Sequence, residues 1–265
     1  MVYSMQRLMP KIAVISDIHS NLHALYSVME DWQSEGCTDV VCLGDIVGYN
    51  AYPQECVEAI RSLQCVVVKG EHEDALLKPD MLQSAHMSCA RHALDWTMAR
   101  LSSEAMQWLS RLPYKALVHS SFMVSHAGDR PVGNTWRHIK SGMDAASCFK
   151  TQMLPVAFCG HSHCPAIYSW QGSMGSAASE SMDELQQNGM MQVRLSPHIK
   201  HLIDVGSVGQ PQDGDPRACY VIYDSDEQVV TFRRVDYDRD AAAQAIEDSG
   251  LPVRLAERLM TGLYA

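Results

Sequence analysis

The stretch of sequence that decides the fold is KIAVISDIHSN, residues 11–21. Residues 11–17 are mostly β-branched or small and apolar, which is typical of a strand buried on both faces. Asp17 and His19 come at the end of that strand. From Leu22 onward, apolar residues recur at helical spacing until Gly36, and a glycine there is typical of a helix C-terminus. The stretch therefore predicts a strand, a polar turn and a helix, which together begin a βαβ unit.

The same alternation continues further along the chain. Residues 39–45 (DVVCLGD) and 65–69 (CVVVK) are predicted as buried strands, and residues 53–63 as a helix with Pro53 in its first turn. Alternating strands and helices with short connecting loops predict a largely parallel sheet. The second half is predicted to be richer in strands, which fall at residues 116–127, 156–159, 166–170, 191–195, 201–205, 218–223 and 229–235.

The chain is predicted to form a single domain over residues 1–265, because no repeat and no long linker divides it. Residues from about 80 to 112 are predicted as a helical insertion. Residues from about 172 to 190, rich in Ser, Gly and Gln, are predicted as a flexible loop or as the tip of an extended hairpin. A last helix is predicted over residues 239–263, with a break near Pro252.

Composition narrows the classes of function. The 265 residues carry 21 Lys and Arg against 31 Asp and Glu, a formal charge of −10. An acidic surface repels a phosphate backbone, so no nucleic-acid polymer is expected as a partner. A small phosphorylated substrate is compatible, because bound metal ions can outweigh the global charge. The sequence shows no signal peptide, no membrane-spanning run and no C-x-x-C pair among nine cysteines, which predicts a cytoplasmic protein without a membrane partner.

Five short clusters of acids and histidines each come after an apolar run: Asp17 with His19, Asp45, Glu71 with His72, His126, and His161 with His163. The carboxyl ends of parallel strands meet at one edge of a sheet, so these side chains are expected to share one crevice. In an extended H-x-H both imidazoles lie on the same side of the strand, where they can serve neighbouring metals. One such histidine is usually an ordinary structural residue, but five clusters in this order predict a metal site.

The order D-x-H, G-D, G-x-H-[DE], H, G-H-x-H resembles the calcineurin-like metallophosphoesterase superfamily. The segments DIVGYNAYPQE (45–55), VGSVGQPQDGDPRACYVIYD (205–224) and LPVRLAERLMTG (251–262) resemble its small bacterial phosphoesterase branch. The resemblance covers nearly the whole chain and its motifs are specific. It implies an α/β fold, a four-layer α-β-β-α sandwich of two mixed sheets flanked by helices.

The resemblance also implies a role for each residue of the clusters. Asp45 would bridge two metals, and His72 matches the position of the family's acid. Asn21 and Arg217 are predicted to contact the substrate, although the DPR stretch at residues 215–217 could equally form a turn with a solvated arginine. The remaining predicted metal ligands are Asp17, His19 and His163 for one ion and Glu71, His126 and His161 for the other.

The implied activity is metal-dependent hydrolysis of phosphomonoesters or phosphodiesters, with a small or nucleotide-like substrate. Two divalent or mixed-valence transition metal ions, about 3.5–4 Å apart, would clamp the phosphoryl oxygens and hold a bridging hydroxide as the nucleophile. Carboxylates and imidazoles suit Mn, Fe, Zn, Co or Ni. The substrate, the native metals and the preference between monoesters and diesters stay open, and a homo-oligomer is compatible with the sequence.

Three positions depart from the family pattern. Glu71 stands where the family has Asn, and Asp17, Asp45, Glu71 and a bridging hydroxide add up to about −4, which cancels two divalent ions. Glu71 would therefore lower anion affinity, favour a trivalent ion such as Fe(III), or swing away from the metals. Gln212 stands where the family has Arg, and Asp204 where it has Asn, so both are expected to shift the local charge in the same direction.

Two other classes of protein were weighed against a phosphoesterase. A catalytically weak or inactive metal-binding scaffold that keeps the fold fits the extra negative charge, but the retained His72 and the complete ligand series argue against it. An H-x-H also opens the H-x-H-x-D-H motif of metallo-β-lactamase-like enzymes. Here Cys164, Pro165 and Ala166 continue the stretch, so that class is discarded.

Overall fold

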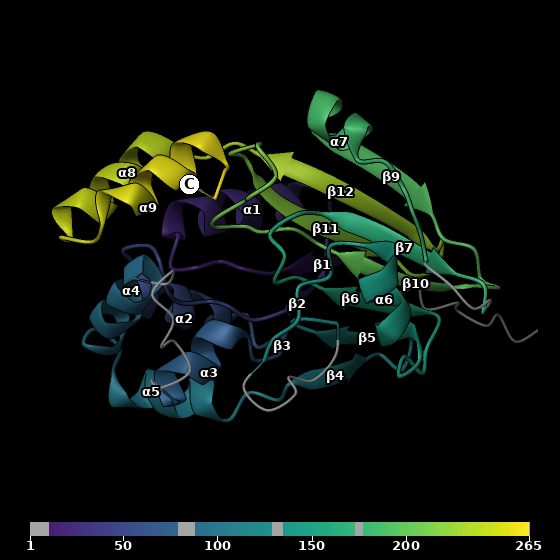
Figure 1. The fold of residues 1–265 in the computed structure, drawn as a ribbon, viewed down its shortest axis with the longest axis horizontal. Helices are drawn as coiled ribbons and strands as arrows, with labels where there is room; N and C mark the ends of the chain where they lie inside the picture. Colours follow the sequence, from purple (N-terminus) through teal and green to yellow (C-terminus); the bar gives the residue numbers. More distant parts are fainter. Residues whose placement is uncertain (1–10, 79–87, 129–134, 173–176, 265) are drawn as a thin grey trace, which may run out of the picture.

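Two six-stranded β-sheets lie face to face between helices in the computed structural model, which describes residues 11–78, 88–128, 135–172 and 177–264 (Figure 1). The first sheet runs, in spatial order, through β3 (Val66–Val67), β2 (Asp39–Cys42), β1 (Lys11–Ile15), β11 (Ala218–Asp224), β12 (Val229–Val235) and β9 (Met190–Arg194). Strands β1, β2 and β3 are parallel, whereas β11, β12 and β9 extend the sheet in antiparallel pairs. The sheet is therefore mixed.

The second sheet is also mixed. It runs through β4 (Lys115–Val118), β5 (Phe122–Ser125), β6 (Val156–Cys159), β10 (Lys200–Asp204), β7 (Ala166–Trp170) and β8 (Ala178–Ser179), with β5, β6 and β10 parallel. The prediction of one strand over residues 116–127 is wrong, because β4 and β5 form a hairpin. His119 and Ser120 are the central residues of its turn, with φ of 48° and 57°, and the Ser121 amide donates to the Val118 carbonyl at 2.9 Å across it. Neither residue is Gly, Asn or Asp, the residues that usually mark a turn with two positive φ values, so the sequence pattern did not reveal the turn.

Aromatic side chains fill the space between the sheets. Phe122 and Phe158 of the second sheet meet Tyr223 of the first, with ring centroids 5.4 and 5.3 Å apart. Phe122 and Tyr223 are nearly perpendicular, a favoured edge-to-face arrangement. Val14 and Phe232 belong to the same cluster, and all five residues are at most 1% exposed. Burial of this surface holds the two sheets together.

Helices form the outer layers of the sandwich. One core cluster joins Ile15 and Tyr220 of the first sheet to helical side chains such as Leu25 and Leu255. A smaller cluster packs Phe149, in helix α6 (Gly142–Phe149), against Leu202 of the second sheet. The four-layer α/β sandwich is therefore confirmed. The helices of the larger layer are α1 (Leu22–Ser34), α2 (Pro53–Ser62), α3 (Glu71–Leu77), α4 (Ser88–Met98), α5 (Ser103–Ser110), α8 (Arg239–Asp248) and α9 (Val253–Thr261).

Three short helices lie where the sequence pattern predicted none: α3, α6 and α7 (Asp183–Asn188). Helix α7 and strand β8 fall within residues 172–190, and β8 pairs antiparallel with β7, so the described part of this stretch is a hairpin arm followed by a helix and not a loop. A buried Leu185 anchors α7, and Gly189, at φ 73°, ends it. Helices this short depend on tertiary packing, which periodicity does not reveal. Helices α4 and α5 lie within the predicted insertion at about 80–112, whose residues 80–87 are outside the described part.

The described helices are short. The longest, α1, has 13 residues, whereas about 20 apolar residues are needed to span a bilayer. No helix in the described ranges is long and apolar enough to cross a membrane.

Candidate metal centre

The candidate ligands converge because the strands before them end together. Asp17 and Asp45 follow β1 and β2 of the first sheet, and His126 and His161 follow β5 and β6 of the second. The Gly160 amide donates to the His126 carbonyl at 2.8 Å, and this bond connects the loop after β5 to the loop after β6. The His161 amide donates to Asp17 Oδ2 at 3.0 Å. That bond joins the two sheets at the site.

Asp17, His19 and His163 form a first group of potential ligand atoms. His163 Nε2 lies 3.2 Å from Asp17 Oδ1 and 3.1 Å from His19 Nε2. His19 Nε2 lies 3.6 Å from Asp17 Oδ1, and all three side chains are buried. Two imidazole nitrogens and a carboxylate oxygen at this spacing fit one cation.

Asp45, His126 and His161 form a second group, whose potential ligand atoms lie within 4.8 Å of one another. Asp45 Oδ2 is 3.3 Å from His126 Nε2. The same oxygen is 3.8 Å from His19 Nε2, which belongs to the first group. Asp45 therefore lies between the two groups, as a bridging ligand would.

Glu71 points toward the second group rather than away from it. Its Oε1 lies 3.7 Å from His161 Nδ1 and 3.9 Å from His72 Nε2. The side chain is 29% exposed, so it occupies the open side of the centre. The alternative in which Glu71 swings away from the metal ligands does not describe this structure.

The backbone orients three of the histidines. Nδ1 of His19, His126 and His163 lies 3.2, 2.9 and 2.5 Å from a main-chain carbonyl oxygen. A carbonyl only accepts, so in each neutral ring Nδ1 carries the proton and Nε2 keeps a lone pair. These are the Nε2 atoms that face one another in the two groups. The tautomers that a metal requires are therefore set by the fold.

The loops that carry the ligands have unusual backbone conformations. Asp17, His19, Asp45, His161 and His163 all have positive φ, from 48° to 71°. Residues other than glycine rarely adopt this region, and each such residue is strained by roughly 1–3 kcal/mol. The prediction of an extended H-x-H is thus wrong, since both histidines are left-handed residues of a loop. Strain concentrated at five candidate ligands marks a site whose geometry the surrounding fold imposes.

Glu73 positions the loop that carries Asp45, a role that the sequence pattern did not reveal. Its Oε2 accepts hydrogen bonds from the Asp45 and Gly70 amides, each at 2.8 Å. Its Oε1 accepts from the Ile46 amide at 2.8 Å and the Val47 amide at 3.4 Å. Glu73 is fully buried. The last position of the G-x-H-[DE] motif is therefore an anchor for backbone amides.

Charge and burial oppose each other in this centre. Burial disfavours ionised Asp17 and Asp45, yet the neighbouring histidines hold the pKa of each below its usual range. Burial also disfavours charged His126, but Asp45 and Asp17 raise its pKa to about 10. Burial and the charge of Asp45 raise the pKa of Glu71 to about 8. Burial lowers the pKa of His72 to about 3. A cation bound among these groups would stabilise the three carboxylates in their ionised form.

Aromatic rings that no motif predicted enclose the centre. His138 stacks on His161, with ring centroids 4.0 Å apart and planes 11° apart. Trp136 lies 6.4 Å from the His161 ring. Tyr49 lies 4.6 Å from the ring of His72. No sequence signal could have found His138, because a lone histidine without a motif gives no spatial information.

The two predicted substrate contacts have other partners. The Asn21 side chain accepts from the Ala24 amide at 3.1 Å, which caps α1, and donates to the Gly209 carbonyl at 3.0 Å. Arg217 pairs with Asp215 at 2.6 Å. Among the described residues, neither side chain has a recorded contact with the ligand groups, so both roles stay predictions.

The other two residues that differ from the family pattern, Gln212 and Asp204, lie next to residues of the candidate ligand loops. Gln212 Nε2 is 3.0 Å from His163 Nδ1, so this amide packs against a ligand histidine. Asp204 is fully buried, with Oδ2 2.7 Å from Ser162 Oγ and Oδ1 accepting from the Gly206 amide. Burial raises the pKa of Asp204 well above its usual value, which favours the protonated acid. The hydrogen bonds from Ser162 and Gly206 act in the opposite direction and favour the ionised form, so the extra charge at Asp204 stays a prediction.

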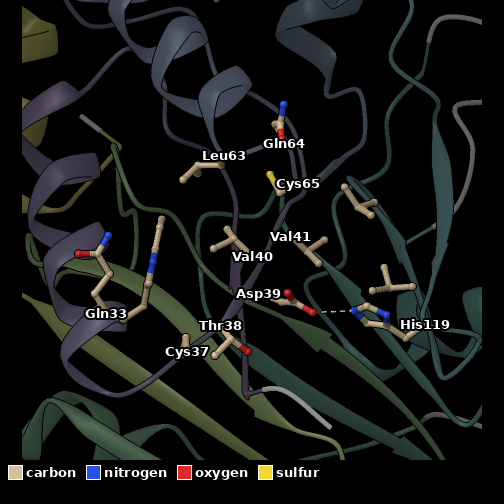
Figure 2. Close-up of a pocket in the computed structure, with 13 residues that line it drawn as sticks. Gln33, Cys37, Thr38, Asp39, Val40, Val41, Leu63, Gln64, Cys65 and His119 are labelled. Atoms are coloured by element: carbon tan, nitrogen blue, oxygen red, sulfur yellow. Dashed lines mark hydrogen bonds and ion pairs between the residues drawn. The ribbon is translucent and has the colours of Figure 1, made fainter.

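A separate pocket of about 380 Å³ lies at the opposite, N-terminal ends of β2 and β3 (Figure 2). Cys37 and Cys65 line it, and burial raises the pKa of both thiols to about 11. His119 pairs with Asp39 at its rim, at 2.9 Å. None of the candidate ligands lines this pocket, so it does not belong to the metal centre.

The donor set fits metal ions. Asp45 Oδ2, His126 Nε2 and both ring nitrogens of His161 are buried and have no hydrogen-bond partner among the described residues. Such groups are costly to bury unless a ligand satisfies them. Mixed carboxylate and imidazole donors, with no thiolate among them, suit a catalytic transition-metal site rather than a structural zinc site. Fold and site together define an α/β sandwich protein with a metal centre at its strand ends.

The sequence matches the family described as "Calcineurin-like phosphoesterase superfamily domain" over residues 10–228. It is 36% identical, over 95% of this chain and 98% of the relative, to the uncharacterised protein MJ0912 of Methanocaldococcus jannaschii. A solved metallophosphoesterase from Sphaerobacter thermophilus is 34% identical, with a TM-score of 0.81 over 96% of this chain and 100% of that one. The hypothetical protein PH1004 from Pyrococcus horikoshii shares the fold, with a TM-score of 0.72 at 19% identity over 97% and 100% of the two chains.

This chain belongs to the calcineurin-like phosphoesterase superfamily. Membership implies metal-dependent phosphoester hydrolysis, and the family uses divalent metal ions. The groups of acids and histidines described above provide the candidate ligands.

Proposed function

We propose that this chain hydrolyses phosphomonoesters or phosphodiesters at a dinuclear metal centre. The observation that carries the proposal is the placement of two ligand groups on either side of Asp45, with His72 beside them. In this assignment Asp45 bridges, and the other ligands are Asp17, His19 and His163 for one ion and Glu71, His126 and His161 for the second.

The carboxylates are oriented for this task. When bound, the ions would supply positive charge for the phosphoryl oxygens and would make the attacking water more acidic. Asp17 Oδ2 accepts from the His161 amide at 3.0 Å, and Asp45 Oδ1 accepts from the His72 amide at 2.8 Å. Each carboxylate therefore keeps its second oxygen for a metal, in a fixed orientation.

His72 is the residue that we assign to the phosphoryl or leaving oxygen. Its side chain is 2% exposed, and its Nε2 lies on the same side of the centre as Glu71. An imidazole N–H held in a buried site stabilises an oxygen on which charge develops. The aromatic rim of Trp136 and His138 suits a small or nucleotide-like substrate, because flat rings pack against a base or a phenyl leaving group.

The test is hydrolysis by protein loaded separately with Mn²⁺, Fe²⁺, Zn²⁺, Co²⁺ or Ni²⁺, assayed on a broad panel of phosphomonoesters and phosphodiesters. We expect hydrolysis of at least one ester, and a loss of about 10²–10³-fold in kcat for His72→Ala. His198→Ala, at an exposed position remote in sequence from the ligand loops, is the matched control and should leave kcat unchanged.

The proposal fails if the metal-loaded protein hydrolyses no ester and His72→Ala behaves like wild type. That pair of results, with metal still bound, would favour the scaffold reading. Metal content measured on the same samples separates an inactive metal protein from one that was never loaded.

A further inference from the structure

The charge of the proposed centre is determined by three carboxylates. Asp17 and Asp45 are fully buried, and Glu71 adds a third acid on the open side. Glu71 Oε1 lies 3.7 Å from His161 Nδ1, close enough for both atoms to reach one ion. Metal ligands of this type bind as ionised carboxylates. The centre therefore carries one more negative charge than an amide at position 71 would give it.

Arg258, a buried cation of this region, acts electrostatically on Tyr49, whose ring packs on His72. It stacks on Tyr264, so it is not counted among the charges of the ligands themselves. The side chains recorded in contact with the described ligands are acids, imidazoles, aromatic rings and the amide of Gln212. Arg217 is held by Asp215 at 2.6 Å. Lys140 is exposed, near His138 in sequence, and solvent and salt screen an exposed charge.

The resulting balance is close to neutral. Two divalent ions contribute about +4, and three carboxylates with one hydroxide contribute about −4. A phosphomonoester carries about −1.5 to −2 at neutral pH, because its second pKa is near 6. A phosphodiester carries about −1, because it has one ionisable oxygen. A neutral centre gains little from the second charge of a monoester, and Glu71 repels that charge at short range.

We propose that Glu71 makes this centre selective for singly charged phosphodiesters over doubly charged phosphomonoesters. This inference rests on the proposed hydrolase function. It depends on divalent ions, since a trivalent ion would restore the positive charge that Glu71 removes. The identity of the bound ions is therefore part of the test.

The test compares wild type with Glu71→Gln, which keeps the side-chain size and removes the charge. Glu30→Gln, the same change at an exposed position of α1, is the control. Metal per chain is measured after loading with Mn²⁺. Methyl phosphate and dimethyl phosphate are titrated calorimetrically into each protein at about pH 7.5, where a monoester is mostly doubly charged. Hydrolysis of p-nitrophenyl phosphate and bis(p-nitrophenyl) phosphate is measured on the same samples.

We expect two Mn²⁺ per wild-type chain and a higher kcat/KM for the diester. In Glu71→Gln the ratio of diester to monoester kcat/KM should fall by about tenfold or more, and methyl phosphate should bind more tightly. An unchanged ratio in a Glu71→Gln protein that still holds two ions would overturn the inference, as would a wild-type preference for methyl phosphate.

Two further results keep the test decisive. If Glu71→Gln loses a metal, wild-type binding of the two phosphates alone decides, because it needs no variant. If wild type hydrolyses neither ester, the proposed function fails, while the two affinities still support or overturn the charge selectivity.

Discussion

The two ligand groups differ in how the protein holds them. His19 and His163 of the first group are buried, left-handed residues, and main-chain carbonyls fix both rings. In the second group, neither ring nitrogen of His161 has a hydrogen-bond partner among the described residues, and its ring stacks on exposed His138. Glu71 beside it is 29% exposed. The first group is therefore built by backbone, and the second partly by side chains at the rim. Substitutions at the second group could therefore change substrate specificity while the first group keeps its geometry.

The largest effect on this comparison is expected when Asp45 is changed, because we propose that it bridges the two ions. Asp45→Asn keeps the shape of the side chain and removes the bridging charge. We expect the bound metal to fall from two ions to about one per chain and kcat/KM to fall by about 10³-fold or more, because clamping needs both ions. Metal analysis and steady-state kinetics provide the measurement.

Asp248→Asn, on the exposed surface of α8, is the control and should match wild type. Full occupancy by two ions in Asp45→Asn would show that the groups bind independently, and the shared role of Asp45 would be wrong.

The next largest effect is expected at Glu73. Its carboxylate accepts hydrogen bonds from the Asp45 and Gly70 amides and so positions the loop that carries Asp45. Glu73→Ala leaves buried N–H groups unpaired, so we expect a loss of about 3 kcal/mol in unfolding free energy. Activity should fall by about 10–100-fold, as it does when a group that orients a ligand is removed. Thermal unfolding and kinetics on the same samples test both.

Glu73→Gln retains one acceptor oxygen and should fall between wild type and Glu73→Ala. If Glu73→Ala loses stability but retains full activity, Glu73 supports the fold without positioning Asp45.

Much of the fold could be predicted from sequence because it repeats simple patterns. β1 and β2 are short apolar runs between turn residues, and α1 and α2 have clear helical periodicity. The β4–β5 turn and α7 could not be found, because His119 and Ser120 are unusual turn residues and α7 depends on one buried leucine. Local sequence patterns do not predict a helix or turn that is stabilised mainly by contacts with residues far away in the sequence.

The ligands could be predicted for a different reason. Motif order placed Asp17, Asp45 and His161 at strand ends, and the sheets brought those ends together. The extended H-x-H argument assumed the wrong geometry for His161 and His163, since both are left-handed residues of a loop, and their role as metal ligands stays a prediction. Residues that act through packing, such as His138, have no motif and needed the folded chain.

A smaller effect is expected at the aromatic rim formed by Trp136 and His138. His138→Ala removes the ring that stacks on His161, and such stacking is worth about 0.5–1.5 kcal/mol. We expect the affinity for one of the two ions to weaken by about 2–10-fold while the other is unchanged. Stepwise metal titration measures the two affinities separately.

His138→Phe restores a flat ring and should recover most of the loss. Equal weakening of both ions, or no rescue by Phe, would contradict the view that the rim supports only the second group.

The smallest effect on the centre is expected far from it, at the C-terminal end of α1. Asp31 accepts from Arg233 Nε at 2.6 Å and Nη2 at 2.8 Å, and from the Tyr220 hydroxyl at 2.6 Å. Burial opposes ionisation of Asp31, but these donors hold its pKa below the usual value of 3.8. The ionised acid therefore stabilises the fold at pH above that value, and the contribution is lost as pH falls through the lowered pKa.

Asp31→Asn should lower the unfolding free energy by about 1–3 kcal/mol at neutral pH, and the difference should shrink toward about pH 3. Urea unfolding of both proteins across this pH range provides the measurement. Metal content should stay at two ions per chain, because Asp31 contacts neither ligand group. If a still-folded Asp31→Asn protein loses either ion, metal binding depends on contacts at the distant end of α1. The difference between the two groups would then not be explained by the residues around them alone.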